Sequence, residues 1–268
     1  MMSTAYHEGF LNTPPLWEKE QFGLPQFKFP PVVISNLKET QLPRNLRLGH
    51  QMEKVFQQLI HSTDSFDLVE HNILVEAGRH RIGELDFIIQ NKNTHQYFHV
   101  ELVYKFYLID PTISEPIYRL VGPNRRDMFY TKLDKLKEKQ LPLLFHPSLT
   151  PLWETLEIDP LKIAQSCCFK AQLFAPLGEK PSIRPLNNAC IAGTWIRFDV
   201  FNTERFRSAS YHMPRKLEWV LSPHLEVPWR SHYEILLDVN LRMVAKNAPM
   251  LWMKTPSGAL SRLFVVWW

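Results

Sequence analysis

Three strand-like runs follow one another within residues 66–108, and this succession constrains the fold more than any other feature of the chain. The runs are FDLVEHNILVE (66–76), RIGELDFIIQ (81–90) and QYFHVELVYKFYL (96–108). The links between them, AGRH and NKNT, are short and polar, as is typical of β-hairpins. Because tight links join antiparallel neighbours, the chain is predicted to form a three-stranded meander here.

A helix is predicted on each side of this meander. Within PRNLRLGHQMEKVFQQLIHS, four apolar side chains share one helical face: Met52, Val55, Phe56 and Leu59. Within GPNRRDMFYTKLDKLKEKQ, a second set shares one face: Phe129, Leu133, Leu136 and Gln140. Asn124 is the expected N-cap of the second helix, with Asp127 at its third position. With CCFKAQLFAP (167–176) as a buried strand, the order helix, three strands, helix, strand predicts an α/β unit.

The two ends of the chain differ in composition from this middle part. Residues 1–43 are rich in proline and aromatic residues without a period, which predicts an extended N-terminal arm before a core of residues 44–178. Residues 179–268 contain TWIRFDVF, LEWVLS, YEILLDVNLRMVAK and RLFVVWW, which we interpret as strands. We therefore predict a mostly β C-terminal region, either a second domain or an added layer on the core.

Composition limits the class of protein. With 268 residues, 45% of them hydrophobic and 22% charged, the chain can bury a sizeable core. A formal net charge of +4 allows nucleic acid as a partner without requiring it. The cysteines Cys167, Cys168 and Cys190 lack zinc-site spacing and cannot all pair, so we expect them to be reduced. Without a signal peptide or an apolar run of about 20 residues, we predict a cytoplasmic protein with no membrane contact; its oligomeric state is left open.

The hairpin carries an unusual set of charged side chains. Alternate residues of a strand share a face, so Glu84 and Asp86 point to one side, as do His99, Glu101 and Lys105 on the next strand. Two neighbouring carboxylates repel each other unless positive charge lies between them. Mg²⁺ or Mn²⁺ suits this role because both take oxygen ligands. The alternative is an exposed charged face without function, which antiparallel sheets often have.

At these residues the chain resembles the PD-(D/E)XK nuclease-like superfamily. GELDFI is similar to the strand that ends in the superfamily aspartate, here Asp86, and Glu101 matches the acid of the [DE]-x-K strand. Glu53, in GHQMEKVFQQL, matches the helix glutamate. Val103 occupies the usual place of the lysine, and Lys105 stands two residues further on. The stretches GELDF, HVELVYKFYL and GPN also resemble an uncharacterised bacterial family, grouped only as a domain of unknown function within that superfamily.

The resemblance implies a restriction-endonuclease-like core with a metal site of Glu53, Asp86 and Glu101. It also implies Lys105 as the catalytic lysine, displaced along its strand. The implied activity is hydrolysis of phosphodiester bonds in DNA or RNA by water that Mg²⁺ or Mn²⁺ activates. The alternative is a catalytically inactive module of the same fold that binds nucleic acid or a protein partner.

Basic residues outside the hairpin are candidates for contact with phosphate. Arg125 and Arg126, near the expected start of the second helix, could hold a phosphate together with free backbone N–H groups. A solvated helix end is an equally good interpretation. Lys132, Lys135 and Lys139 form a basic stripe on the same helix, which we interpret as solvated surface.

Overall fold

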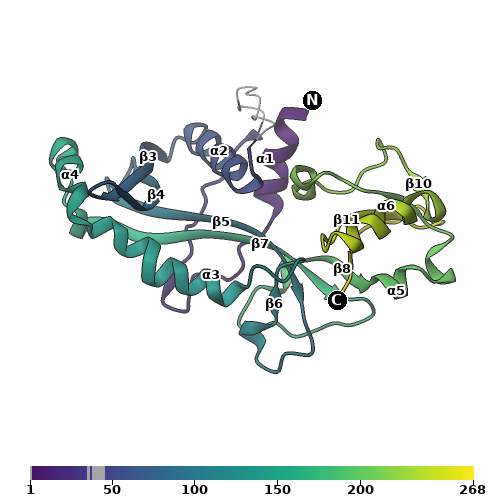
Figure 1. The fold of residues 1–268 in the computed structure, drawn as a ribbon. Coiled ribbons are helices and arrows are strands. Elements are labelled where there is room, and N and C mark those ends of the chain that lie inside the picture. Colours follow the sequence, from purple (N-terminus) through teal and green to yellow (C-terminus); the bar gives the residue numbers. More distant parts are fainter. Residues whose placement is uncertain (1, 35–36, 38–45) are drawn as a thin grey trace. The chain divides into compact units, whose positions relative to one another are not determined.

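The computed structural model describes residues 2–34, 37 and 46–268, and the fold is mixed α/β with a large mixed sheet (Figure 1). The chain folds into two compact units. The first comprises Met1–Leu11, Pro15–Tyr104 and Thr131–Lys170, and the second comprises Asn12–Pro14, Lys105–Tyr130 and Ala171–Trp268. None of the described helices is long and apolar enough to cross a membrane. The expected boundary between residues 43 and 44 lies outside the described residues.

The first unit contains the predicted meander. Its strands are β3 (Phe66–Ala77), β4 (His80–Asn91) and β5 (Tyr97–Ile109). Strand β4 pairs antiparallel with both β3 and β5. The predicted buried strand is β7 (Ala164–Pro176), which lies next to β5 on the other side. Both expectations from the hydrophobic pattern are therefore confirmed.

Helix α2 (Leu48–His61) packs through its predicted apolar face. The four side chains of that face are fully buried: Met52, Val55, Phe56 and Leu59. The ring of Phe56 lies against Phe87 of β4, with 4.5 Å between the ring centroids. Since contacts of this kind bury a large apolar area, they fix α2 on the meander. The first residues of the predicted helix, 43–45, lie outside the described part of the chain.

A second layer of the first unit covers apolar side chains of β3 and β4. Helix α4 (Thr150–Leu156) and the turns beside it form this layer. Trp153, Leu144 and Leu149 pack there against Val75 and Leu85. This layer therefore buries Val75, Leu85 and Ile88 of the meander, whereas other residues of β3 and the start of β4 stay half-buried or exposed.

The N-terminal segment differs from the expected extended arm. It begins with helix α1 (Met2–Asn12), followed by a small hairpin of β1 (Glu20–Gln21) and β2 (Leu24–Pro25). The sequence showed no helical period because His7 and Phe10 are the buried side chains of α1 among those described. After the helix the backbone lies along β7: the N–H of Leu16 donates to the carbonyl of Phe169 at 2.9 Å.

The second predicted helix starts later than expected. Helix α3 (Phe129–Lys135) continues as a π-helical turn (Leu136–Gln140) and a 3₁₀ turn (Leu141–Phe145). Asn124 is not its N-cap, because the Asn124 side chain accepts the N–H of Ala248 at 2.8 Å. The GPN stretch forms a tight turn instead, in which Arg125 adopts a positive φ of 53°. The N–H of Gly122 donates to the carbonyl of Asp127 at 2.6 Å and closes this turn.

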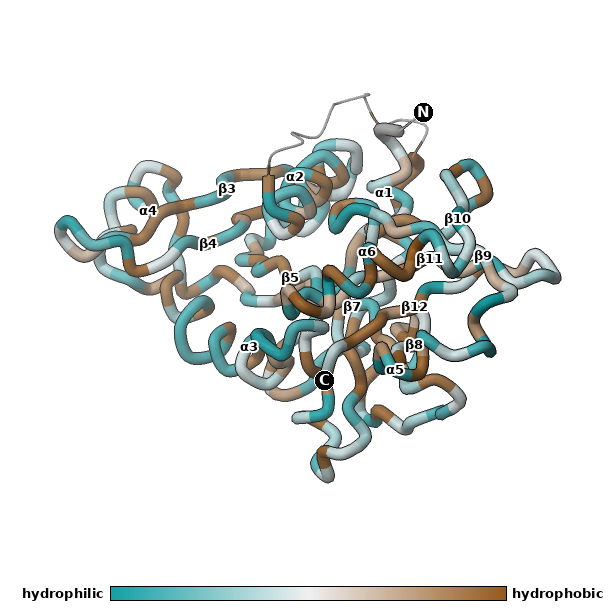
Figure 2. Tube along the Cα trace, turned by 45° about the vertical axis from the view of Figure 1, so that its right-hand side comes forward, coloured by the Kyte–Doolittle hydropathy of each residue, from teal (hydrophilic) through white to brown (hydrophobic). Residues whose placement is uncertain are grey.

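The remaining strands belong to the second unit. They are β6 (Leu120–Val121), β8 (Ile191–Arg197), β9 (Ser210–His212), β10 (Arg230–Ser231), β11 (Met250–Lys254) and β12 (Leu260–Val266). Their order is β10-β9-β11-β12-β8-β7, with β6 beside β5. Strand β8 is parallel to β7 and β12, and the other pairs are antiparallel. The second half of β12, residues 263–266, is hydrophobic and buried (Figure 2).

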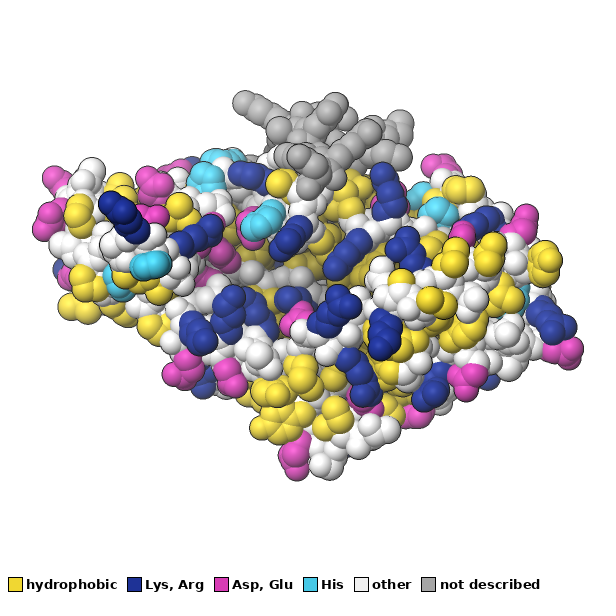
Figure 3. Space-filling model, viewed as in Figure 1, with side chains coloured by type: hydrophobic (Ala, Val, Ile, Leu, Met, Phe, Trp, Pro, Cys, Tyr) yellow, Lys and Arg dark blue, Asp and Glu magenta, His cyan; other side chains and the backbone are white. Residues whose placement is uncertain are grey.

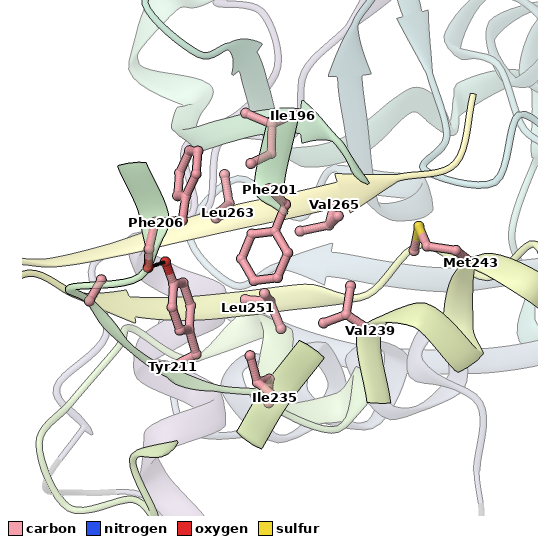
Figure 4. Packing of buried hydrophobic residues seen from close by; sticks show 11 residues of the cluster. Ile196, Phe201, Phe206, Tyr211, Ile235, Val239, Met243, Leu251, Leu263 and Val265 are labelled. Atoms are coloured by element: carbon pink, nitrogen blue, oxygen red, sulfur yellow. Dashed lines mark hydrogen bonds between the residues drawn. The ribbon is translucent and has the colours of Figure 1, made fainter. Parts of the chain in front are cut away.

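Two helices correct the prediction of a mostly β C-terminal region. TWIRFDVF ends as helix α5 (Phe198–Phe201), and YEILLDVNLRMVAK forms helix α6 (His232–Val244). LEWVLS forms a 3₁₀ turn rather than a strand. The side chains Ile235, Val239 and Met243 of α6 belong to one hydrophobic cluster with Phe201 and residues of β11 and β12 (Figure 4). The region is therefore itself mixed α/β.

The start of α6 depends on a capping box. The Ser231 hydroxyl accepts the N–H of Glu234, and the Glu234 carboxylate accepts the N–H of Ser231. Ser231→Ala is expected to lower the free energy of unfolding by about 1 kcal/mol, because it removes the cap. Urea denaturation measures this loss. The exposed Ser208→Ala is the control and should change stability by less than about 0.5 kcal/mol; equal effects of the two variants would contradict the role of the cap.

Candidate carboxylate site

Asp86 and Glu101 lie side by side on neighbouring strands of the first unit. Phe87 of β4 pairs with Val100 of β5, and this register places the two carboxylates opposite each other. Asp86 Oδ2 accepts the N–H of Leu102 at 2.8 Å, and the N–H of Asp86 donates to Glu101 Oε1 at 3.4 Å. Glu101 is fully buried. The predicted pair is therefore assembled by the meander itself.

The surroundings of Asp86 disfavour its charged form. Burial raises the pKa of Asp86 well above its ordinary value, and the negative charges of Glu101 and Glu53 raise it further. The N–H of Leu102 and the positive charge of Lys132 act in the opposite direction. Two adjacent carboxylates in a dry setting cost folding free energy, and a bound cation would remove that cost.

Glu101 is held by a chain of hydrogen bonds. Its Oε1 lies 3.0 Å from His99 Nε2, and its Oε2 accepts from the side-chain amide of Gln140. Lys132 Nζ in turn donates to Gln140 Oε1 at 2.6 Å. On the other side, Gln165 Nε2 lies 3.2 Å from His99 Nδ1. With Gln165 as donor, His99 is the tautomer that donates from Nε2 to Glu101.

Glu53 is not joined to the pair as a third ligand. Its Oε2 lies 3.0 Å from His50 Nδ1 on the same helix. Its charge acts on Asp86 through space, as the raised pKa of Asp86 indicates. Within the described ranges, no three His, Cys, Asp or Glu side chains are arranged to hold a metal ion.

The structure places Lys105, the lysine expected from the sequence, in an ion pair. Its Nζ donates to Asp127 Oδ2 at 2.6 Å within the second unit, and both side chains are partly exposed. Val103, at the usual place of the lysine, is 2% exposed. The lysine that acts on Asp86 and reaches Glu101 through Gln140 is Lys132, which belongs to the first unit.

The π-helical turn explains how Lys132 and Gln140 meet. Residues eight positions apart in an uninterrupted α-helix are offset by about 80° around the axis, since each residue turns about 100°. In the wider π turn at 136–140 each residue rotates the chain less about the helix axis, so the angle between the Lys132 and Gln140 side chains becomes smaller than about 80°. Gln140 is a polar residue on an otherwise apolar helical face, and this exception is the signal in the sequence by which its role could have been found.

Other lysines of the same stretch lie outside the network. Lys135, Lys137 and Lys139 are exposed. On the face shown in Figure 3, Lys and Arg side chains gather over α3. This basic surface is suited to phosphate contact, although solvated lysines alone do not require a partner.

Arg125 and Arg126 precede helix α3 instead of lying in its first turn. Arg125 Nη2 donates to the buried carboxylate of Asp110 at 2.6 Å. The Arg125 guanidinium also lies over the Trp268 ring, 3.9 Å from its centroid. Arg126 is exposed. The first arginine therefore stabilises the turn of the second unit, and the predicted helix-end phosphate site is not formed as expected.

The chemistry of the pair fits a hard divalent cation. Mg²⁺ keeps several of its waters and is commonly held by one or two carboxylates together with substrate phosphate. Asp86 and Glu101 would supply these two carboxylates. The Gln140 amide would have to release Glu101 Oε2 to a cation, whereas the hydrogen bond from His99 could persist.

Stability is expected to fall with rising pH because of Asp86. The folded state keeps the Asp86 proton to higher pH than the unfolded chain, so raising the pH above about 4 opposes folding until the raised pKa is passed. Asp86→Asn has no carboxyl proton to lose, so above the raised pKa of Asp86 this variant should be more stable than the wild type. Urea denaturation of both proteins across pH, without divalent cations, measures the effect; parallel curves would contradict it.

Residues 32–266 match the model of a family described as Domain of unknown function (DUF1853), so the chain belongs to this family. The match confirms the expected membership in an uncharacterised family, whereas the relation to the nuclease superfamily stays a prediction. A search of curated proteins found no match, and a search of solved structures found none either.

Proposed function

We propose that this member of the DUF1853 family is a divalent-cation-dependent hydrolase of phosphodiester bonds in DNA or RNA. The observation that carries the proposal is the adjacent pair of half-buried Asp86 and fully buried Glu101, in which the pKa of Asp86 is raised. Carboxylates perturbed in this way concentrate at functional sites, because catalysis and cation binding need them.

The proposed roles follow from the contacts of each side chain. Asp86 and Glu101 hold Mg²⁺ or Mn²⁺, with Glu53 as a nearby negative charge. When bound, the cation polarises a phosphoryl oxygen and lowers the pKa of a coordinated water. His99 orients Glu101, Gln140 holds Glu101 Oε2 until the cation replaces it, and Lys132 supplies positive charge beside the pair. The exposed lysines that continue from Lys132 along the same stretch would contact the backbone of the nucleic acid.

A cleavage assay tests the proposal. Purified protein is incubated with supercoiled plasmid, single-stranded DNA and RNA, in Mg²⁺, in Mn²⁺ and in a chelator. Cation-dependent cleavage of at least one substrate is expected. The absence of cleavage from all three substrates in both cations would overturn the enzymatic proposal.

A catalytically inactive module that binds nucleic acid is the second candidate. Two observations favour it: Val103 is buried at the usual place of the lysine, and both oxygens of Glu101 accept hydrogen bonds from the protein. Such a module would bind the same substrates without cutting them. Electrophoretic mobility shifts without any cleavage product would therefore support this candidate over the enzyme.

A further inference from the structure

The first unit contains a pocket of about 500 Å³ whose lining does not include Asp86 or Glu101. Its walls come from residues 25–31, from the start of β3, from the turn between β4 and β5, and from the start of β7. The backbone of the N-terminal wall is fixed, because the N–H of Phe27 donates to the carbonyl of Cys167 at 2.8 Å. Pockets of this volume are typical of small-molecule sites.

Flat apolar surfaces dominate the pocket. Four phenylalanines line it, together with three prolines: Phe27, Phe29, Phe66, Phe98, Pro25, Pro30 and Pro31. The rings of Phe27 and Phe66 are 5.4 Å apart between centroids, and those of Phe66 and Phe98 are 6.1 Å apart. Both pairs meet edge to face, and Phe27 and Phe66 are each 8% exposed, so the half-buried Phe29 and Phe98 offer the ring surface for stacking. Nucleobases are stacked on aromatic side chains in this way without regard to sequence.

A few polar groups complete the lining. Ser166 is 5% exposed, and its Oγ has no hydrogen-bond partner among the residues described. A buried hydroxyl without a partner is costly, so a ligand atom that bonds to it would gain affinity. Gln165 is held in place by its hydrogen bond to the carbonyl of Leu141 at 2.7 Å. Lys28, an exposed residue of the lining, adds a positive charge.

We propose that this pocket binds a nucleotide. The ligand must have flat apolar faces for the phenylalanines, a polar edge for the Ser166 hydroxyl and an anionic group for Lys28. A nucleoside monophosphate combines these three properties in a molecule that the volume admits. Binding here does not require Asp86 and Glu101 to hold a cation, although Gln165 joins the pocket to Glu101 through His99.

Titration with the four nucleoside 5′-monophosphates, followed by NMR or calorimetry, tests the proposal. Wild-type protein should bind at least one of them saturably. Ala164 is exposed and lines the pocket, so Ala164→Phe should obstruct it and weaken binding by about tenfold or more without opening the core. Leu161→Phe, which adds a ring at an exposed site outside the lining, is the matched control and should bind like the wild type.

Two further variants locate the ligand. Lys28→Ala should weaken the monophosphate by about two- to fivefold and leave the corresponding nucleoside unchanged, because an exposed charge pair contributes modestly. Asp86→Asn should bind the nucleotide as the wild type does, whatever its effect on cleavage. Failure of the wild type to bind any of the four, undiminished binding by Ala164→Phe, or loss of binding in Asp86→Asn would each overturn the proposal.

Discussion

Asp86→Asn is expected to abolish both the stabilisation of the protein by Mg²⁺ or Mn²⁺ and its cation-dependent cleavage of nucleic acid. A ligand that binds only the folded state stabilises it by mass action, by about 2.7 kcal/mol at 100 times its dissociation constant. Asparagine keeps the shape of Asp86 but lacks the negative charge that attracts the cation. Thermal unfolding with and without cation measures the first effect, and plasmid cleavage measures the second.

Glu84→Gln is the matched control for this variant. Glu84 lies on the same strand, but its carboxylate accepts hydrogen bonds from Asn72 and Arg81. The control should therefore keep the response to cations. Without cations, Asp86→Asn should unfold at a higher temperature than the wild type near neutral pH, because the repulsion within the carboxylate pair is gone. A variant at Asp86 that responds to cations as the wild type does would exclude the carboxylate pair as their site.

Much of the first unit could be predicted from its sequence because one pattern dominates there. Two-residue alternation, short polar links and the apolar face of α2 all indicate the same arrangement, and the structure contains it. Asp86 and Glu101 meet because pairing in a meander brings residues at mirrored positions around a turn together. The position of the pair therefore follows from local pattern and the length of one turn.

Helix α6 was missed because it carries apolar side chains on more than one face. Ile235, Val239 and Met243 face the core, whereas Leu237 and Leu241 are 66% and 58% exposed. A second apolar stripe fills the gaps of the first, so the period of 3.6 residues that marks a surface helix is obscured. The serine and glutamate of the capping box, S-x-x-E, were the remaining signal for a helix start.

The lysine of the site could not be located from strand spacing. Lys132 comes from a helix some thirty residues beyond Glu101 in sequence, and a π-helical turn determines which side chain it meets. Neither the turn nor its effect on orientation is encoded in a short motif. Lys105 forms an ion pair with Asp127 and does not contact the carboxylate pair in the described contacts.

Lys132→Met is expected to reduce cleavage by about a hundredfold or more, whereas Lys105→Met should keep most of the activity. Loss of a positioned acid, base or charge typically costs two to four orders of magnitude in rate. Lys105 lies in a partly exposed ion pair, which contributes at most about 1 kcal/mol to stability. Lys132→Arg keeps the positive charge and should recover part of the loss. If Lys105→Met were inactive and Lys132→Met active, the lysine that acts in cleavage would be Lys105, as the strand spacing predicts.

A second measurement separates the charge of Lys132 from a merely structural role. Its positive charge lowers the pKa of Asp86, so Lys132→Met should raise that pKa further. Because a cation must compete with the proton on Asp86, the stabilisation by Mg²⁺ should then begin at higher pH than in the wild type. Gln140→Leu breaks the link to Glu101 but keeps the charge of Lys132, so the pH at which stabilisation by Mg²⁺ begins should stay nearly unchanged. If stabilisation by Mg²⁺ began at the same pH in Lys132→Met as in the wild type, the lysine would not act on the carboxylate pair.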